Sequence, residues 1–444
     1  MSTAVVVGSG VVGLLSAILL KRNYDQVLLI EKAKTCGGLL SSINHEGYNY
    51  DFGTHVPTLT NNEKLDEILF GDQATRDKYW QKHEYLITEN YFSGQWNENT
   101  ALIDARSLPE EDYKKGLYEL LHQGKMSNSD EAFQYCSESF GKTFTDLLFR
   151  PTMKKFTGAE LEDLDKMAIR FFGLERIVCL TPEISNKLKE LESFDDRLGF
   201  HNSNDKLPPA PHMYPKGDVG VGYWIDFLVE SAKKAGVEII NENSVTKISH
   251  ENRKIQTITT EDKKVIEIDH LVWTVPPFLA FKASGLSLKL KPPTLRTTSL
   301  FHFSFDKPLL KQKSLYLWCF DEKFKSFRIT LYPNIRLEDS HQNQFGLTVE
   351  VLSTQEEAEK LAEQDILQEL VQMDIVNADH KALHSKKMVL PNTFPVPDHD
   401  FRANVIKQAN FLNDSFSNFS LLGRHSGKSW FVNEVVNEVY QALT

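Results

Sequence analysis

The start of the chain alternates apolar runs and glycines in a pattern that predicts a strand, a helix and a second strand. Residues 4–7 are continuously apolar and mostly β-branched, which is typical of a strand buried on both faces of a parallel sheet. Apolar residues then recur at helical spacing over residues 14–21, and a second apolar run occupies residues 27–30. This order predicts the first strand–helix–strand unit of a parallel α/β sheet.

The same α/β pattern returns in two later regions of the chain. An apolar stripe at helical spacing ends at Gly236, and strands are expected at residues 238–240 and 271–275. Near the end, the segment FSLLG predicts another strand, and the apolar face of a last helix runs to Leu443. These segments are expected to join the first unit in one discontinuous domain.

The segments in between have a different pattern of apolar and polar residues. Helices are expected at residues 110–122 and 129–148, and strands with one charged helix (about residues 355–374) follow further along the chain. We therefore predict an α/β fold, in which a Rossmann-like domain with a parallel sheet and helices carries an inserted mixed α+β substrate domain. Three separate segments (1–60, 208–285 and 391–444) are expected to form the nucleotide-binding domain. Between them we expect a helical and mixed insertion (61–207) and a β-rich substrate-binding region (286–390).

Three glycines between the first strand and the helix indicate a dinucleotide site. Gly8 suits a tight turn, Gly10 lets the backbone approach a pyrophosphate, and Gly13 lets the helix lie close to the strand. The helix N-terminus would present free N–H groups to the phosphates. Glu31 ends the second strand, where an acid accepts hydrogen bonds from ribose hydroxyls.

A second glycine pair, Gly37 and Gly38, follows this acid directly, and a hairpin-like segment comes next. A nicotinamide-binding domain would have a crossover helix here, and no clear helical pattern is present. A further loop of small residues can instead approach the longer flavin dinucleotide. The pattern therefore favours FAD over a nicotinamide nucleotide.

With the sequence DFGTH that ends at His55, this series resembles the FAD-dependent amine-oxidase-like superfamily, which includes amine oxidases, protoporphyrinogen oxidases, carotenoid desaturases and UDP-galactopyranose mutases. A segment beginning YPKGD resembles the family's YPxGG, with Asp218 where a second glycine is usual. The resemblance implies FAD contacts from Gly8, Gly10, Val11, Val12, Gly13, Glu31, Lys32, Gly37, Gly38, Leu39, Val245, Gly423, Arg424, Phe431 and Val432.

Two further segments resemble the mutases in particular. FKSFRITLYPNIR places Arg328, and LLGRHSGKSWFVNEVV places Arg424, where the mutases have arginines that flank the diphosphate of a UDP-sugar. A guanidinium binds phosphate oxygens through two parallel hydrogen bonds. The resemblance implies His55, Arg328 and Arg424 as catalytic residues, with His55 beside the flavin ring, and Arg328, Arg424 and Lys428 as substrate-binding residues. Thr54 replaces a glycine of the mutases, and Lys428 replaces a substrate-binding tyrosine.

Simpler roles remain open for each of these residues. Arg328 could be an exposed cross-strand charge, Arg424 could contact only the flavin phosphates, and His55 could be a hydrogen-bonded structural histidine. Asp379, His380 and His384 have metal-like spacing, but a solvated turn is the better interpretation, and no metal is expected.

Three functions follow from these alternatives. The first is a mutase-like enzyme, in which the N5 atom of reduced flavin attacks a nucleotide-diphosphate sugar, with NAD(P)H as a candidate external reductant. The second is an FAD-dependent oxidase or dehydrogenase of the amine-oxidase or protoporphyrinogen-oxidase type, which takes a hydride from an organic substrate. Apolar aromatic walls, rather than two phosphate-binding arginines, would then line the pocket. The third is a flavin-stabilised scaffold without catalysis.

Composition narrows the partners. The net charge of −11 argues against nucleic acid and against an anionic membrane over most of the surface, so an anionic substrate needs a local cluster of arginine or lysine. Four cysteines without CxxC spacing favour reduced thiols in the cytoplasm. The longest apolar run, residues 11–20, is too short to span a bilayer, and we expect no integral membrane segment and no signal peptide.

Overall fold

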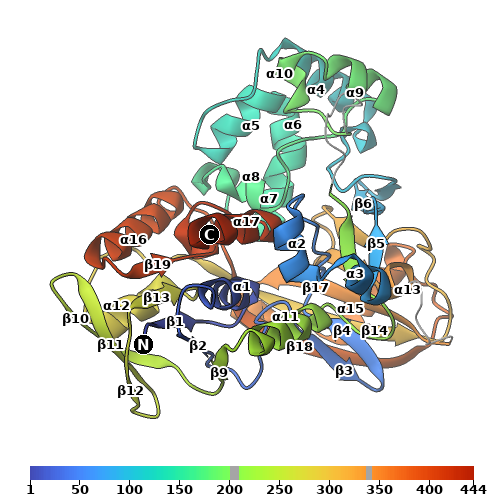
Figure 1. The fold of residues 1–444 in the computed structure, drawn as a ribbon. Helices are drawn as coiled ribbons and strands as arrows, with labels where there is room; N and C mark the ends of the chain where they lie inside the picture. Colours follow the sequence, from blue (N-terminus) through green and yellow to red (C-terminus); the bar gives the residue numbers. More distant parts are fainter. Residues whose placement is uncertain (201–209, 337–342) are drawn as a thin grey trace.

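The computed structural model describes residues 1–200, 210–336 and 343–444 of the chain. Figure 1 shows a helical lobe standing beyond a layered body that contains two large sheets. The N-terminus lies at β1 (Thr3–Val7), and the C-terminus lies at the end of α17 (Val432–Leu443), which runs beside α1 (Val11–Leu20). The first and last segments of the chain therefore meet in the same layer.

A five-stranded sheet forms the base of this layer, in the order β19-β13-β1-β2-β9, and every neighbouring pair is parallel. Its other strands are β2 (Gln26–Ile30), β9 (Glu238–Ile240), β13 (His270–Trp273) and β19 (Phe419–Leu421). The whole of β1 is buried, and burial of each of its valines contributes roughly 1.5–3 kcal/mol. The predicted α/β fold class with a Rossmann-like parallel sheet is confirmed.

Alternate residues of β1 face two hydrophobic clusters. Ala4 and Val6 belong to a cluster with α1, α17 and α11 (Gly222–Lys234), which cover one face of the sheet. Val5 and Val7 belong to a second cluster on the opposite face. That face is covered by a small antiparallel sheet and two helices: β10 (Val245–Glu251), β11 (Lys254–Thr260), β12 (Val265–Glu267), α12 (Pro277–Ser284) and α16 (Phe401–Ser415).

The second large sheet has seven strands in the order β18-β14-β17-β16-β15-β6-β7. Its neighbours are antiparallel except for the pair β15 and β6, which is parallel. Most of its strands come from the predicted substrate region, although β18 continues beyond residue 390. The strands are β6 (Thr88–Phe92), β7 (Gln95–Asn97), β14 (Leu295–Phe305), β15 (Tyr316–Cys319), β16 (Ser326–Leu331), β17 (Phe345–Ser353) and β18 (Ala382–Pro395).

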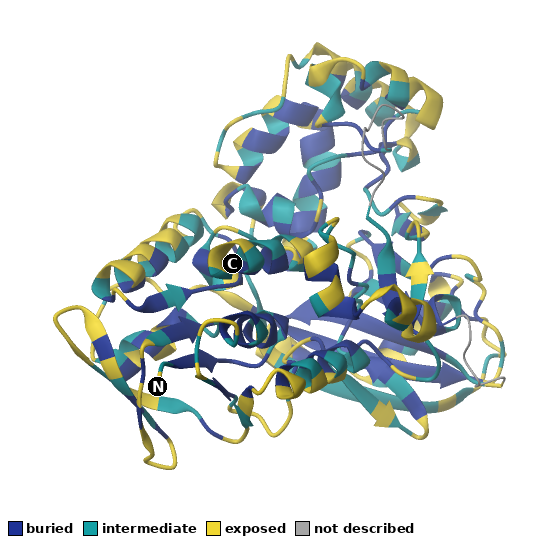
Figure 2. Cartoon of the chain, in the orientation of Figure 1, coloured by how far each residue is buried: buried dark blue, intermediate teal, exposed yellow. Residues whose placement is uncertain are grey.

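Smaller elements join the two sheets. The hairpin-like segment after Gly38 is a hairpin, in which β3 (Ser42–His45) pairs with β4 (Tyr48–Asp51). Two short helices come next, α2 (Glu63–Phe70) and α3 (Gln73–Tyr79). After them, β5 (Trp80–His83) pairs with β8 (His212–Pro215), which comes from later in the chain. A short helix, α13 (Tyr332–Ile335), follows β16. In Figure 2 the strands of both large sheets are mostly buried, and exposure concentrates on the outer helix faces and loops.

The helical lobe contributes phenylalanines, including Phe140, Phe144, Phe149 and Phe156, to a core that it shares with strands of the second sheet. The helix expected over residues 129–148 is interrupted, because Gly141 ends the first helix with a φ of +86°. A π-helical turn then leads into the next helix. The lobe contains α4 (Glu110–His122), α5 (Ala132–Phe140), α6 (Lys142–Phe144), the π-helix (Thr145–Phe149), α7 (Arg150–Thr157), α8 (Met167–Phe171), α9 (Pro182–Leu188) and α10 (Glu192–Asp195).

The charged helix expected at about residues 355–374 is also two helices, α14 (Gln355–Lys360) and α15 (Glu363–Gln372). The break falls at Leu361 and Ala362, whose backbones are extended. The Ala362 N–H donates to the Asp365 carboxylate, which stabilises the start of α15. The polar pattern predicted one helix, but Asp365 within it caps the start of a second helix.

We predict that Gly13→Ala destabilises the protein by about 2–3 kcal/mol, because an added Cβ would lie 1.8 Å from the Gly8 carbonyl oxygen. Gly10→Ala is the matched control. Gly10 has a φ of −67°, and a Cβ there meets nothing within 4 Å. Chemical denaturation of the cofactor-free proteins measures both changes, and equal stability of the two variants would contradict this packing.

Candidate active site

The N-terminus of α1 offers free backbone donors. Gly10 caps the helix without a side-chain hydrogen bond, and the first amide bonded within the helix is that of Leu14, to the Gly10 carbonyl. Among the residues that the structure describes, the N–H groups of Val11, Val12 and Gly13 have no hydrogen-bond partner. The space above Gly10 is open, whereas Gly8 and Gly13 are packed. This arrangement fits the pyrophosphate of a dinucleotide.

Glu31 is fixed beside this turn. Its Oε2 atom accepts hydrogen bonds from the Ser9 backbone N–H at 2.9 Å and the Ser9 hydroxyl at 2.6 Å. Its Oε1 atom accepts one from the Ala33 N–H at 2.8 Å. The Asn243 N–H donates to the Glu31 carbonyl, which brings the start of β10 and Val245 near the same strand end. The carboxylate is therefore fixed at the end of β2, beside the N-terminus of α1.

The second glycine loop lies against the first, because the Gly37 N–H donates to the Ser9 carbonyl at 3.1 Å. Gly38 has a φ of +59° and open space where a Cβ would point. From the end of the chain, Gly423 lies over the first turn of α1, where its Cβ would come within 3.5 Å of Val12. The two glycine loops, Glu31 and Gly423 thus surround the N-terminus of α1 and form a cradle, whereas the side chains of Lys32 and Leu39 are exposed.

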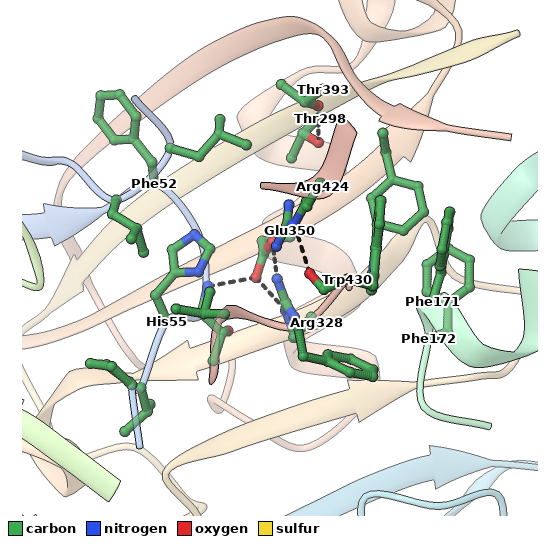
Figure 3. A pocket seen from close by; sticks show the side chains of 18 of the residues that line it. Phe52, His55, Phe171, Phe172, Thr298, Arg328, Glu350, Thr393, Arg424 and Trp430 are labelled. Atoms are coloured by element: carbon green, nitrogen blue, oxygen red, sulfur yellow. Dashed lines mark hydrogen bonds and ion pairs between the residues drawn. The ribbon is translucent and has the colours of Figure 1, made fainter. Parts of the chain in front are cut away.

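A cavity of about 490 Å³ continues from this cradle toward the helical lobe. Leu39, Phe431 and Val432 line its end near α1 and α17. Its other walls are largely aromatic, as Figure 3 shows for several of them. Aromatic side chains on these walls are Phe52, Phe171, Phe172, Trp224, Trp318, Phe327, Phe394 and Trp430. His55, Arg328 and Arg424, predicted together from the sequence, all line this cavity.

Arg328 is paired with an acid that the sequence analysis did not identify. Arg328 on β16 and Glu350 on β17 are directly opposite each other in the sheet. The Nε and Nη2 atoms of Arg328 donate to the two carboxylate oxygens of Glu350, at 2.6 and 2.8 Å. Burial is the largest single influence and would raise the pKa of the Glu350 carboxyl, but the charge of Arg328 and the hydrogen bonds from Arg328 and Thr54 together lower that pKa. The pair is therefore a cross-strand ion pair between a buried acid and a half-buried arginine.

Glu350 also holds the loop that carries His55. The Thr54 N–H donates to Oε1 of Glu350 at 2.8 Å. Gly53 has a φ of +103°, and a Cβ there would lie 2.6 Å from Oε2 of Glu350. A signal for this residue exists in the sequence, because Glu350 is a lone charge within the apolar run FGLTVEVLS. A buried charge of this kind requires a partner.

Arg424 has different surroundings. Its Nε atom donates to the Trp430 carbonyl at 2.8 Å, and its guanidinium carbon lies 4.7 Å from the centre of the Trp430 ring. The residue is exposed overall, but desolvation of its guanidinium at the cavity, and then the charge of Arg328, lower its pKa. Its Nη atoms have no hydrogen-bond partner within the residues that the structure describes. Lys428, four positions later, is exposed and does not line the cavity.

His55 is neutral at pH 7. Burial, and then the charge of Arg328, lower its pKa to about 4, although the Glu350 carboxylate acts in the opposite direction. The imidazole therefore faces the cavity as a neutral group that can donate one hydrogen bond and accept another.

The helical lobe reaches the cavity through α8 and the loop before α17. Phe171 stacks on Trp430 with ring centres 3.5 Å apart. Arg170 forms an ion pair with Glu434 at 2.6 Å, and Glu434 also accepts the N–H groups of Trp430 and Phe431. The aromatic wall is thereby tied to the N-terminus of α17. The sequence analysis missed these aromatic residues, which come from distant segments.

The sequence predicted neither a metal site nor a membrane-spanning helix. No cluster of three or more His, Cys, Asp or Glu side chains suited to a metal ion occurs among them. His380 instead accepts the Asn377 N–H and lies 3.0 Å from the Pro308 carbonyl, and Asp379 pairs with Lys307. None of the helices in the described ranges has both the length and the apolar character needed to cross a bilayer.

Known proteins place these features in context. Residues 6–69 match the model of an NAD(P)-binding Rossmann-like domain. The chain is 25% identical over 355 residues to the 1-hydroxycarotenoid 3,4-desaturase of Flavobacterium sp. (strain P99-3), covering 75% of this chain and 70% of that protein. It is 47% identical over 367 residues to the phytoene desaturase of Cercospora nicotianae, covering 73% of this chain and 54% of that protein. The chain thus spans about half the length of the latter relative.

A solved structure of reduced UDP-galactopyranose mutase matches the whole chain. Its TM-score is 0.76, and the match covers 100% of this chain and 94% of that one at 16% identity. At this identity the likeness concerns the fold. The fold thus agrees with a mutase, whereas the sequence relatives are desaturases.

We predict that Glu350→Met costs about 3 kcal/mol of stability, because it leaves the half-buried Arg328 without its counter-charge. The double variant Arg328→Met/Glu350→Met should recover most of this loss, because two apolar side chains can fill the same space. Urea denaturation of the two variants and the wild type gives the comparison. A cost below about 1 kcal/mol for the single change would indicate a solvent-screened pair.

A second prediction concerns pH and His55. Its folded pKa of about 4 lies below the ordinary 6.5, so the unfolded chain binds the proton first as pH falls. This residue alone should remove up to about 2 kcal/mol of stability between pH 7 and pH 5. His55→Gln should therefore lose less stability than the wild type over that interval. Equal losses in denaturation curves at the two pH values would show that His55 is solvated.

Proposed function

This chain has the fold of the FAD-dependent amine-oxidase-like superfamily, and we propose that it is an FAD-dependent oxidoreductase that takes a hydride from an organic substrate. The first alternative from the sequence, a mutase acting on a nucleotide-diphosphate sugar, has less support. The choice depends on what surrounds Arg328 and on the walls of the cavity.

The residues present fit FAD. Free amides at the start of α1 suit the pyrophosphate, Glu31 suits a ribose, and the open space at Gly10 and Gly38 admits a ligand against the backbone. Arg424, Phe431 and Val432 would then lie along the flavin side of the cavity. When bound, FAD supplies a two-electron acceptor for a hydride.

The single observation that carries the proposal is the bidentate pairing of Arg328 with Glu350. A mutase-type site needs two arginines free to bind a diphosphate dianion, and here one of them is already neutralised by a carboxylate. The other walls are aromatic, which suits an apolar organic substrate. The names of the desaturase relatives also favour removal of hydride from a hydrocarbon-like substrate.

In this function the chain binds and orients the substrate and excludes water. One carbon–hydrogen bond of the substrate would break and its hydride would pass to the flavin. The neighbouring carbon or nitrogen would lose a proton to solvent, and the electron pair left there would form the new double bond, so that the substrate is oxidised by two electrons. Neutral His55 and the aromatic walls would position the reacting carbon. An external NAD(P)H reductant is not needed for this half-reaction, because the substrate itself reduces the flavin.

The intact site also favours an enzyme over a scaffold, because buried charges would be costly to retain without use. We place the protein in the cytoplasm, where its four unpaired cysteines would remain reduced.

The decisive experiment compares two kinds of ligand under anaerobic conditions. The purified protein, loaded with FAD, is mixed with unsaturated hydrocarbon, amine and porphyrinogen donors, and loss of the oxidised flavin absorbance is followed. We expect at least one donor class to reduce the flavin. In parallel, chemically reduced protein is offered UDP-hexoses with cyanoborohydride. A trapped flavin–sugar adduct, together with no reduction by any donor, would overturn the proposal in favour of the mutase.

A further inference from the structure

The charges that line the cavity do not balance. Arg328 and Arg424 are cations, and Glu350 is the one acid among the described residues that line it. His55 and His212 are neutral at pH 7, because burial is the main cause that lowers the pKa of each to about 4. The protein therefore brings one uncompensated positive charge into a largely apolar cavity.

This charge resides on Arg424. Arg328 uses two of its N–H groups on Glu350, whereas Arg424 uses only Nε, on a neutral carbonyl. After desolvation, the charge that lowers the pKa of Arg424 is the repulsive one of Arg328. Because Arg424 is exposed at the cavity, its Nη atoms can exchange water for an anion and form charge-assisted hydrogen bonds with it. Its Nη atoms are available for that purpose.

An aromatic surface begins at the same point. The Arg424 guanidinium lies over the Trp430 ring. Phe171 stacks on Trp430, with ring centres 3.5 Å apart. Phe394 meets Trp430 edge-on at 5.8 Å, and Phe172 stacks on Phe394 at 4.8 Å. These four rings, the aromatic strip, form a continuous apolar surface that leads away from the free cation.

We propose that the substrate is amphipathic and carries one anionic group, a carboxylate or a phosphate ester, that binds the Nη atoms of Arg424 while its apolar part lies along the aromatic strip. This assignment rests on the proposed oxidoreductase function and names its substrate class. It also explains why Glu350 neutralises Arg328 while Arg424 has no acidic partner in the described parts of the chain. The single anionic group of the substrate would pair with Arg424.

Arg424 has one competing role, since a cation near the flavin ring could instead stabilise the negative charge of the reduced cofactor. The two roles differ in what a substitution changes. Loss of a substrate contact changes ligand selectivity, whereas loss of a flavin contact lowers the reduction potential and leaves selectivity intact.

The test uses FAD-loaded protein and four probes that share one apolar body: 4-phenylbutanoate, 4-phenylbutyl phosphate, 4-phenylbutanol and 4-phenylbutylamine. Binding is measured by titration calorimetry and by perturbation of the flavin spectrum, with no turnover required. We expect the better anion to bind roughly ten- to a hundredfold more tightly than the alcohol, and the amine to bind most weakly. The order of the two anions distinguishes a carboxylate substrate from a phosphate ester.

Arg424→Met should abolish the preference for the anions over the alcohol and leave alcohol binding within about threefold. Lys428→Met is the matched control, because it removes an exposed cation of the same loop outside the cavity lining, and the anion preference should survive it. Bound FAD and the thermal midpoint of each variant confirm that the site remains folded.

Three results would overturn the inference: no anion preference in the wild type, an unchanged preference in Arg424→Met, or a lowered flavin potential in that variant with selectivity intact. The proposed function fails separately, when no organic donor reduces the flavin and UDP-hexoses form an adduct. Neutral donors that reduce the flavin without any anion preference would preserve the function and remove the substrate class assigned to it.

Discussion

One buried carboxylate determines the geometry of the site. Glu350 lies in the middle of β17. Its carboxylate accepts hydrogen bonds from Arg328 on the neighbouring strand and from the Thr54 N–H in the loop after β4. A carboxylate removed from water is tolerated only when its oxygens are hydrogen-bonded and its charge is matched. Both conditions are met here, and meeting them fixes three segments together. The position of His55, the charge of the cavity and the close approach at Gly53 all follow from it.

The cofactor cradle could be predicted from the sequence because its requirements are local. Turn geometry and helix–strand contact within one short segment require the glycines at positions 8, 10 and 13. Glu31 follows at the end of the next strand. The five-stranded parallel sheet likewise followed from apolar runs. The helix breaks at Gly141 and Leu361 were missed, because apolar or polar periodicity continues across both.

The contents of the cavity were less predictable because they depend on pairing between distant segments. Resemblance to known motifs correctly brought His55, Arg328 and Arg424 to one cavity. It did not indicate that Arg328 already has a partner, since Glu350 is matched to it only by the register of β16 and β17. The aromatic strip was missed for the same reason. Two arginines that look equivalent in sequence are therefore chemically different, and the difference changes the preferred chemistry.

The order of strands in the five-stranded sheet has a consequence for how the chain acquires its structure. β1 lies between β2 and β13, so Val5 has one neighbour close in sequence and another, Leu271, from far along the chain. β19, still later, completes the edge. Contacts of such long separation form slowly, because a large loop must be closed before they are made. During synthesis the first strand–helix–strand unit therefore stays incomplete until β13, β19 and α17 have been made, and the dinucleotide site is among the last parts of the fold to form.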